Sequence, residues 1–413
     1  MRRRPEVEAM GEAPIVVYSA PWCPHCRRVK KFLSAHRVRH ETIDVDERPE
    51  AIEGLRRLQG GGQIIPTVVY PDGEHDVNPS DERLAGRIGL KLEAASAAYD
   101  LTIVGGGPAG LAAAIYAARE GIDTIVIDAN ALGGQAGITN RIDNYPGFPE
   151  GVSGGELTAR FIEQARRFGV ELLSAVAVSS VTGDGNDLSI ALSTGQQVTS
   201  PVAIVASGSN YRRLNVPGEE DLIGAGVHFC ATCDGPFYSG AEELIVIGGG
   251  NSALEEGLHL AEFAQRIRVV TRSGLSASSI LQDRVRSDAQ FVIETGLDIE
   301  AFQGEGGRFS AVVTRDRATG ESRSLPAAAA FVFVGLTPNA GFLDASVARD
   351  EGGFLVTGPN METTVPGVFA AGDVRSGSIK QLGSAVGEGI AALLMARRWL
   401  EDRRLKSVAL VDD

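Results

Sequence analysis

Apolar and polar positions in the first ninety residues alternate in a way that is typical of a small α/β domain. Short apolar runs predict three strands, and Val29, Phe32 and Leu33 share one face of a predicted helix. The predicted strands are 14–20, 40–46 and 64–70, and the predicted helices are 24–36 and 49–58. A Pro-Asp-Gly turn at 71–73 follows the third strand.

Further along, the chain twice repeats a buried strand, a glycine-rich turn, an apolar helix and a second strand. The first repeat comprises a strand at 100–104, a turn at 105–110, a helix at 111–120 and a strand at 124–128. The second comprises a strand at 243–247, a turn at 248–253, a helix at 254–264 and a strand at 266–270. Each turn reads G-x-G-x-x-G/A, which lets the backbone approach a pyrophosphate. Two complete repeats predict two dinucleotide sites rather than two chance glycine turns.

The two predicted sites differ at the end of their second strand. The first ends at Asp128, which is placed to bind ribose hydroxyls, so this site suits FAD or NAD. The second has Thr271 at that position, followed by Arg272. An arginine there can bind a 2′-phosphate, which favours NADPH, although NADH stays open and Arg272 could instead be a solvated surface residue.

The four cysteines form two C-x-x-C pairs, Cys23–Cys26 and Cys230–Cys233. Cys23 lies at a strand-to-helix junction, where backbone N–H groups, the helix dipole and the nearby Arg27 and Arg28 would stabilise a thiolate. Such pairs perform dithiol exchange. The alternatives are a zinc site, for which the pairs lie far apart, and two buried apolar cysteines.

Two side chains beside these cysteines have open roles. His25 stands between the first two cysteines, where it could tune their potential or be an exposed spacer. Asp234 follows Cys233 and could exchange protons with the dithiol, or cap a turn.

Composition limits the partners. The 413 residues suggest about three domains at ~150 residues each. A net charge of −14 argues against nucleic acid or an anionic membrane as the main partner. The basic start MRRRPEVEAMGEAP is followed by no apolar h-region, and no apolar run is long enough to span a bilayer. We therefore expect a cytoplasmic protein with catalytic dithiols and no metal.

The N-terminal segment resembles the glutaredoxin family, through Trp-Cys-Pro-x-Cys at the helix start. Within it, the segments 65–68, 72–73 and 78–80 are similar to the mycoredoxin-type branch. The resemblance implies that Cys23 is the nucleophile and Cys26 the resolving thiol. It also implies that Pro66 follows a cis peptide bond and that Pro66 and Trp22 contact the substrate.

Residues 99 to about 400 resemble the low-molecular-weight thioredoxin reductases. The motifs are GGGPAG (105–110), GGQ (133–135), NYPG (144–147), CATCDG (230–235), GGGNSALEE (248–256) and VPGVFAAGDV (365–374). The resemblance implies an α/β chain with a thioredoxin-like fold followed by two Rossmann-like domains, the second inserted into the first. The implied segments are a glutaredoxin-like domain at 14–90, a linker at 91–98, an FAD domain at 99–211 and 326–400, an NAD(P)H domain at 214–325, and a tail at 401–413.

The same resemblance assigns roles to individual residues. Cys233 would face the flavin, Cys230 would attack the outgoing disulfide, and Asp234 would donate a proton. Asp373 would bind the ribityl chain, with Lys380 and Gln381 near the isoalloxazine ring. The implied FAD residues are Gly105, Gly107, Pro108, Ala109, Gly110, Asp128, Gly134, Gln135, Asn144, Gly208, Gly372, Asp373, Lys380 and Gln381. The implied nicotinamide residues are Gly248, Gly250, Asn251, Ser252, Ala253 and Arg272.

Two segments depart from the family pattern. The family's His-Arg-Arg motif with a further arginine is here Thr271-Arg272-Ser273, with Ala277 at the later position. The segment GSIKQLGSAVGEG is similar to flavoprotein relatives that lack the cysteine pair.

The sequence thus predicts one electron path, from NADPH to FAD, to Cys230–Cys233, to Cys23–Cys26 and to an external disulfide on a protein or low-molecular-weight thiol. The segment 86–98 would be the tether, the domains would move between steps, and a homodimer is implied. The alternatives are a peroxiredoxin reductase resembling the alkyl hydroperoxide reductase flavoprotein, and a redox sensor without turnover.

Overall fold

The computed structural model describes residues 14–20, 23–36, 38–48, 50–139, 141–142, 144–183 and 187–409, with the side chains of Pro24, Cys233 and 406–409 left out. The chain divides into two units. One comprises Met1–Thr139, Ser153–Gly208 and Ala340–Asp413, and the other comprises Asn140–Val152 and Ser209–Asn339.

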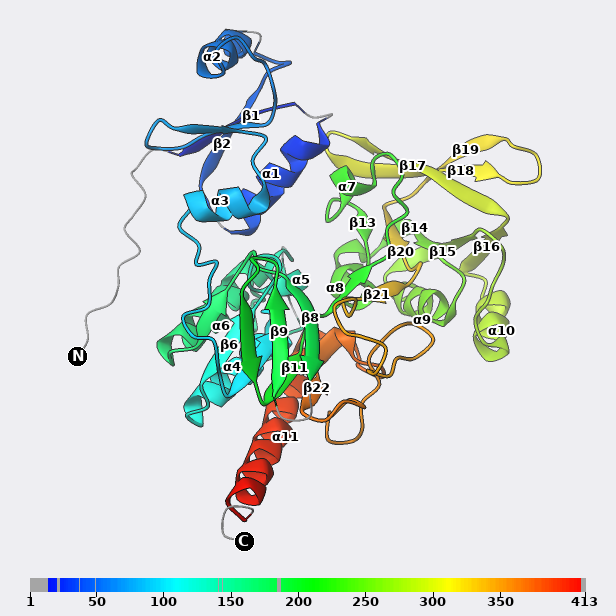
Figure 1. Cartoon of the computed structure of the whole chain (residues 1–413). Helices are drawn as coiled ribbons and strands as arrows, with labels where there is room; N and C mark the ends of the chain where they lie inside the picture. The colour runs from blue at the N-terminus through cyan, green and yellow to red at the C-terminus, as the bar shows by residue number, and fades with distance from the viewer. Residues whose placement is uncertain are drawn as a thin grey trace. The chain divides into compact units, whose positions relative to one another are not determined.

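The N-terminal domain is a four-stranded sheet with three helices, as the thioredoxin-like prediction requires (Figure 1). The strand order is β2-β1-β3-β4; β1 and β2 are parallel and the other pairs antiparallel. Apolar side chains of β1, α1, β3 and α3 form its core. The elements are β1 (Ile15–Ser19), α1 (Pro24–Ala35), β2 (His40–Asp44), α2 (Glu50–Leu58), β3 (Thr67–Val69), β4 (His75–Val77) and α3 (Asp81–Arg87).

The strand predicted at 64–70 is shorter than expected. It begins only at Thr67, because the N–H and the carbonyl of Ile64 both bond to the side chain of Gln59, outside the sheet. Pro66 has no N–H to donate to a ladder. The Ile65–Pro66 bond is cis, as the glutaredoxin resemblance implied.

The first dinucleotide-binding fold contains a five-stranded sheet in the order β22-β11-β5-β6-β7, in which all neighbours are parallel. A three-stranded antiparallel sheet, β8-β9-β10, belongs to the same unit. The strands are β5 (Leu101–Val104), β6 (Thr124–Ile127), β7 (Glu171–Leu173), β8 (Val178–Gly183), β9 (Leu188–Leu192), β10 (Gln197–Ser200), β11 (Val202–Val205) and β22 (Val368–Ala370). The helices are α4 (Pro108–Arg119), α5 (Gly134–Gly137), α6 (Gly154–Arg167), η2 (Gly372–Val374) and α11 (Leu382–Ala409).

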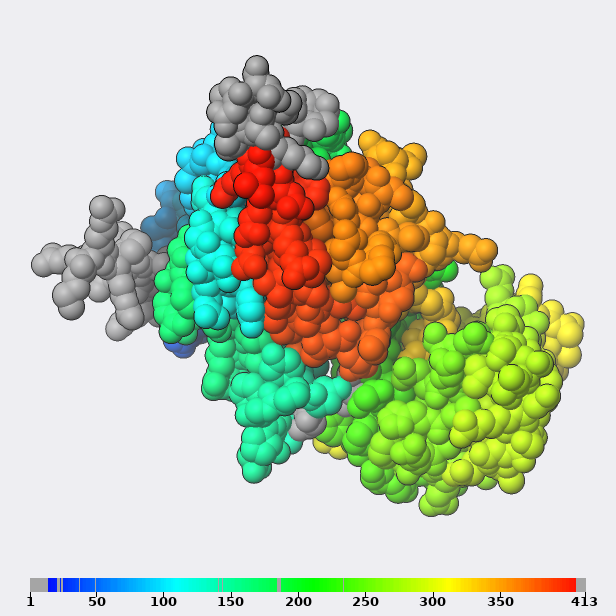
Figure 2. Space-filling view, turned by 90° about the horizontal axis from the view of Figure 1, so that it is seen from below, coloured from blue at the N-terminus to red at the C-terminus, as the bar shows by residue number. Residues whose placement is uncertain are grey.

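Helices α4 and α11 pack at backbone contact. A Cβ on Gly389 of α11 would lie 2.0 Å from the carbonyl oxygen of Ala109 in α4, so only glycine allows this approach. Small residues such as Ala113, Ala392 and Ala396 continue the contact into the apolar core. Figure 2 shows α11 in red along the surface of the molecule, beside the cyan part of the chain. This packing places the start of α11 next to the glycine turn that precedes α4.

The second unit repeats the same plan. Its parallel sheet has the order β13-β20-β14-β15-β16, and β17-β18-β19 form an antiparallel sheet. Two further strands, β12 and β21, pair with each other. The elements are β12 (Ser209–Tyr211), α7 (Glu219–Leu222), β13 (Val227–His228), α8 (Ala231–Asp234), η1 (Gly235–Tyr238), β14 (Ala241–Ile247), α9 (Asn251–Leu260), β15 (Ala264–Thr271), α10 (Ser279–Ser287), β16 (Phe291–Thr295), β17 (Leu297–Glu305), β18 (Arg308–Asp316), β19 (Ser322–Pro326), β20 (Ala329–Val332) and β21 (Leu336–Pro338).

Three boundaries within this unit differ from the prediction. Residues 326–339 were assigned to the FAD domain, but β20 hydrogen-bonds to β14, so they belong to the second unit. β12 (Ser209–Tyr211) also falls in the second unit, because it pairs with β21. The helix predicted at 254–264 ends at Leu260, because Ala264 already pairs with Ala241 in the sheet.

The expected tether at 86–98 is held against the FAD-domain strands. Its first residues, to Arg87, belong to α3. Further on, Glu171 accepts hydrogen bonds from Lys91, from the N–H of Ala95 at 2.8 Å and from the hydroxyl of Tyr99 at 2.7 Å. Gln196 bonds to both the N–H and the carbonyl of Ala94. Leu90 donates its N–H to the carbonyl of Ala85 at 2.9 Å, so the expected tether is hydrogen-bonded to α3 up to Leu90 and to the FAD-domain strands from Lys91 onward.

Candidate functional site

The first dithiol lies where strand β1 gives way to helix α1. Cys23 is the N-cap of α1, and its Sγ accepts a hydrogen bond from the N–H of Cys26 at 3.1 Å. The two cysteines form a disulfide, with their Cα atoms 5.3 Å apart, and both are buried. The carbonyl of Ile65, just before Pro66, lies 4.0 Å from the Cys23 Sγ. The loop predicted to contact the substrate is thus next to Cys23, the predicted nucleophile; Trp22 lies outside the described residues.

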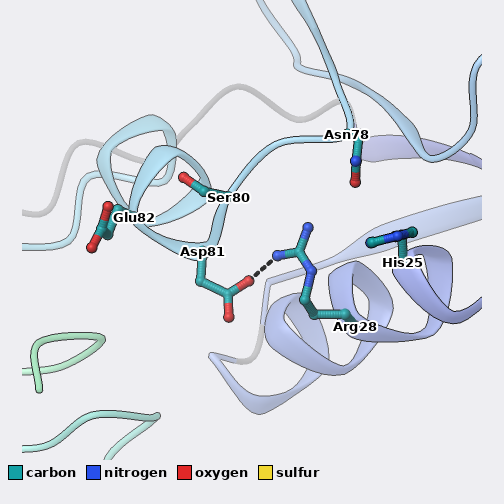
Figure 3. A pocket seen from close by; sticks show the side chains of 6 residues that line it. All are labelled: His25, Arg28, Asn78, Ser80, Asp81 and Glu82. Carbon is teal, nitrogen blue, oxygen red and sulfur yellow. Dashed lines mark hydrogen bonds and ion pairs between the residues drawn. The ribbon is translucent and has the colours of Figure 1, made fainter.

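A polar hollow of about 430 Å³ is lined by His25, the residue before Cys26, and by residues of α1 and of the segment 78–82 (Figure 3). Arg28 lines it but forms an ion pair with Asp81 and donates a hydrogen bond to the carbonyl of Pro79. The positive charge expected near Cys23 from Arg28 is therefore offset by Asp81. His25 is exposed and also lines the hollow. The residues around the hollow are His25, Arg28, Asn78, Ser80, Asp81 and Glu82.

The first glycine turn has no room for side chains. Gly105 has φ 109°, and a Cβ there would lie 2.3 Å from the carbonyl oxygen of Ala206. A Cβ on Gly110 would lie 1.9 Å from the carbonyl oxygen of Gly105. Gly107 is the N-cap of α4, with Pro108 and Ala109 in the first turn. The turn therefore presents only backbone at the start of α4, as a pyrophosphate site requires.

Asp128 fixes this turn from the end of β6. Its carboxylate accepts hydrogen bonds from the N–H of Gly106 at 2.6 Å and from the N–H of Asn130 at 2.7 Å. Burial raises the pKa of Asp128, whereas these two N–H donors lower it. The carboxylate expected to bind ribose hydroxyls is thus already oriented by the glycine turn itself.

A second glycine segment meets the turn. Gly134 has φ 57°, and a Cβ on it would lie 3.1 Å from the Cα of Gly107. Gly133 donates its N–H to the carbonyl of Gly106 at 2.8 Å. Gln135 follows in α5. The two predicted FAD segments therefore form one cradle of bare backbone.

Asp373 supplies the polar group of this cradle. It lies in η2, and its buried Oδ1 has no hydrogen-bond partner among the described residues. Burial raises its pKa and the charge of Glu388 adds to this, while the charge of Lys380 opposes it. An unsatisfied buried carboxyl oxygen is costly unless a ligand hydroxyl bonds to it. Gly372, next to Asp373, would place a Cβ 3.0 Å from that of Ala109. The residues present therefore fit FAD, with its pyrophosphate at α4 and a ribityl hydroxyl at Asp373.

Lys380 does not point freely at a ligand in this structure. Its Nζ donates to the carbonyls of Asp373 at 2.8 Å and Arg375 at 2.9 Å, and lies 4.2 Å from the ring centre of Phe354. Burial lowers its pKa. Its expected place near the isoalloxazine ring, like that of Gln381, stays a prediction.

Two expected FAD residues are not gathered with this cradle by a described contact. Asn144 is grouped with the second unit. Gly208 has φ 70°, and a Cβ there would meet no atom within 4 Å. The roles of both residues stay predictions.

One supporting residue was missed from the sequence. Glu388 of α11 accepts hydrogen bonds from the N–H of Gly372 at 2.9 Å and from Arg375 Nε at 3.1 Å. Burial raises the pKa of Glu388, but the bonds and charge of Arg375 outweigh it and lower the pKa overall. Its one sequence signal was an acid in the stretch 382–396, which holds no other charged residue.

The second glycine turn has the same construction. A Cβ on Gly248 would lie 2.4 Å from the carbonyl oxygen of Phe333, and Gly250 is the N-cap of α9. Asn251 Oδ1 accepts the N–H of Ser278 at 2.8 Å; Ser252 is exposed and Ala253 buried. Again only backbone is presented at the start of the helix, which fits the pyrophosphate of NAD(P)H.

Arg272 shares a carboxylate with a second arginine. Its Nε lies 3.1 Å from Asp298, whose other oxygen lies 3.5 Å from Arg317. The Arg272 side chain is 72% exposed, so it remains accessible to a ligand.

The second dithiol segment forms the short helix α8. Cys230 is disulfide-bonded, and the side chain of Cys233 lies outside the described residues. Asp234 lies 3.4 Å from His228 Nδ1, and the other ring nitrogen of His228 lies 2.7 Å from the hydroxyl of Tyr238. Burial and the charge of Asp234 raise the pKa of Tyr238 to about 12. The expected proton donor thus has a buried histidine beside it, which sequence reasoning did not identify.

The described residues contain neither a candidate metal site nor a candidate membrane span. In these ranges no three His, Cys, Asp or Glu side chains gather closely enough to hold a metal ion. Nor does any helix in the described part of the chain have the length and apolar character to cross a membrane.

Comparison with protein families gives two matches. Residues 99–389 match the pyridine nucleotide-disulphide oxidoreductase family, and residues 15–75 match the glutaredoxin family. Similar proteins include the thioredoxin reductase of Bacillus subtilis, 35% identical over 74% of this chain and 95% of that protein. The thioredoxin reductase of Treponema pallidum is 37% identical over 73% of this chain and 97% of that protein.

Solved structures agree with these matches. The thioredoxin reductase of Streptococcus pyogenes MGAS5005 has a TM-score of 0.69 and 35% identity, over 74% of this chain and 99% of that chain. The thioredoxin reductase of Giardia duodenalis has a TM-score of 0.70 and 32% identity, over 74% of this chain and 100% of that chain. Both resemblances inferred from the sequence are confirmed.

The glycine cradle makes one direct prediction. Gly110→Ala puts a Cβ into the carbonyl of Gly105, so we expect the purified variant to hold about a tenth of the FAD held by the native protein, a loss of about 1.4 kcal/mol or more. The flavin-to-protein absorbance ratio measures this. Gly387→Ala in α11 is the control, because its Cβ would meet no atom within 4 Å. Full flavin content in Gly110→Ala would contradict the assignment of the cradle.

Proposed function

Since the chain belongs to the pyridine nucleotide-disulphide oxidoreductase family and carries a glutaredoxin domain at residues 15–75, we propose that it is a disulfide reductase with a built-in acceptor. FAD and NAD(P)H are the cofactors of this enzyme. The observation that carries the proposal is the disulfide at the start of α1, in a chain that already holds the Cys230 disulfide. Electrons would pass from the second dithiol to the first and then to an external disulfide.

The residues around each cofactor have distinct tasks. The glycine cradle and Asp373 would hold FAD, and the turn before α9 would hold NAD(P)H. Bound FAD would supply the two-electron chemistry that links NAD(P)H to the Cys230–Cys233 disulfide. Asp234 would exchange the accompanying proton with the dithiol, and His228 would hold that carboxylate in place.

The transfer between the dithiols is an exchange in two attacks. The Cys230 thiolate attacks the Cys23 sulfur, the Cys23–Cys26 bond breaks, and Cys26 leaves as a thiolate. Cys233 then attacks Cys230 in the mixed disulfide, which restores the Cys230–Cys233 bond and releases Cys23. The products are one disulfide and one dithiol, so electrons and atoms balance. Cys23 can next attack an external disulfide, with Cys26 as the resolving thiol.

Covalent fusion favours this exchange. A short connection raises the local concentration of an acceptor to about the millimolar range. The linker contacts of Glu171 and Gln196 hold the chain before Tyr99 in place, so the movement needed for exchange would come from the second unit. We propose that the second unit moves about the points where the chain passes between the units, which include 208–209 and 339–340.

The external substrate would be a protein disulfide or the disulfide of a low-molecular-weight thiol. The polar hollow supports such an acceptor, because His25, which lines it, stands between Cys23 and Cys26 in the chain. A homodimer and a cytoplasmic location belong to this proposal. The named relatives are thioredoxin reductases, so neither a peroxiredoxin reductase nor a sensor without turnover is favoured.

Single-cysteine variants test the proposed relay. In Cys23→Ser we expect reduction of the Cys230 disulfide by NADPH at the native rate, but reduction of a small external disulfide at least about 100-fold slower, because the attacking thiolate is gone. NADPH consumption with and without the disulfide measures both steps. Cys230→Ser should lose external reduction as well. Native external turnover in Cys23→Ser would show that the first dithiol is not the outlet.

Arg272 tests the choice of nicotinamide nucleotide. We propose that its exposed guanidinium binds the 2′-phosphate of NADPH. A lost charge-assisted hydrogen bond costs about 1.5–3 kcal/mol, so Arg272→Ala should raise the KM for NADPH about tenfold or more and leave that for NADH unchanged. Arg266→Ala is the control, because Arg266 lies on β15, the strand that ends just before Arg272, and pairs with Glu243. Equal KM values for NADPH in both variants would refute the proposal.

A further inference from the structure

A half-buried carboxylate on α9 is hydrogen-bonded to the backbone of the segment that carries the second dithiol. Glu256, on α9, accepts a hydrogen bond through Oε2 from the N–H of Ala231 at 3.0 Å. It also bonds to the backbone of Thr232. Ala231 and Thr232 are the two residues directly after Cys230. The Glu256 carboxylate therefore accepts hydrogen bonds from the first two N–H groups after Cys230.

The first dithiol has no such carboxylate among its described contacts. At the start of α1, the Cys23 sulfur accepts the N–H of Cys26 at 3.1 Å, and donors of this kind stabilise a thiolate. At α8 the carboxylate of Glu256 accepts the N–H of Ala231, so a negative charge lies beside the residue that follows Cys230. A nearby negative charge disfavours a thiolate on Cys230 and so raises the pKa of that thiol.

Thiolate stability determines reduction potential. A dithiol whose reduced form is stabilised is the stronger oxidant, and one whose reduced form is destabilised is the stronger reductant. We propose that Glu256 sets the direction of electron flow, by holding the Cys230–Cys233 pair at a lower reduction potential than Cys23–Cys26. The direction of flow rests on the proposed relay, whereas the effect of Glu256 on the second dithiol does not.

The role requires an ionised Glu256, which the neighbouring N–H donors and His259 favour. Burial nevertheless raises the pKa of Glu256 above its usual value; the N–H bonds of Ala231 and Thr232 and the charge of His259 oppose this rise, and the charge of Glu255 adds to it. The neighbouring groups on α8 and β13 are Asp234 and His228, which contact each other rather than Glu256. The same helix, α9, begins at the glycine turn that would hold NAD(P)H. One helix therefore links the nucleotide turn to the dithiol.

Glu256→Gln removes the negative charge but keeps the hydrogen bonds, because the amide oxygen can still accept the N–H groups of Ala231 and Thr232. The measurement is made on full-length holoenzyme in a Cys23→Ser/Cys26→Ser background, so that one dithiol remains. Equilibration with a glutathione redox buffer, followed by thiol labelling, gives the dithiol-to-disulfide ratio. We expect the ratio to rise about tenfold toward the dithiol, which corresponds to about 30 mV. The Cys230 thiol pKa, from the pH dependence of alkylation, should fall.

Glu255→Gln is the matched control. Glu255 is adjacent on α9 but exposed, so its variant should keep the native ratio and thiol pKa. Glu256→Asp is a second variant that keeps the charge, and its ratio should stay within about twofold of native. A native ratio and thiol pKa in Glu256→Gln would overturn the proposal. Failure of the relay alone would instead appear in the Cys23→Ser kinetics, and would leave this result unchanged.

Discussion

Backbone N–H groups in the first turns of four helices carry the chemistry of this chain. Such groups have no partner within their own helix and must bond to something else. At α4 and α9 they face glycine turns that expose only backbone, where a pyrophosphate can bind. At α1 they bond to the Cys23 sulfur, and at α8 they bond to the carboxylate of Glu256. The same kind of donor would thus hold a phosphate at α4 and α9, and it bonds to a disulfide sulfur at α1 and to a carboxylate at α8.

This view explains how two similar C-x-x-C pairs can have different roles. Both consist of cysteines three residues apart at the start of a helix. The difference that we propose is the negative charge of Glu256, whose carboxylate bonds to the N–H of Ala231 beside Cys230. If the Cys230 thiolate is less stable than the Cys23 thiolate, the second dithiol has the lower reduction potential, and electron transfer from the second dithiol to the first is favourable. The fixed linker before Tyr99 then limits the motions by which the two pairs can meet.

The sequence predicted the features that depend on local chemistry. The glycine turns at Gly105 and Gly248, both cysteine pairs and the cis bond before Pro66 all appear where they were expected. Contacts between distant residues were not predictable. Glu256 reaches Ala231 across 25 positions, and Glu388 reaches Gly372 across 16, and neither pair has a pattern of spacing or composition that reveals it. Strand β20 was assigned to the wrong domain, because its sequence is equally suited to either parallel sheet.

The central claim is that the first dithiol accepts electrons from the second. The most direct test is to add excess NADPH to the oxidised protein without oxygen, block the thiols and locate the label by mass spectrometry. The account predicts label on Cys23 and Cys26 as well as on Cys230 and Cys233. Label on Cys230 and Cys233 alone would contradict it, and the glutaredoxin domain would then need another source of electrons.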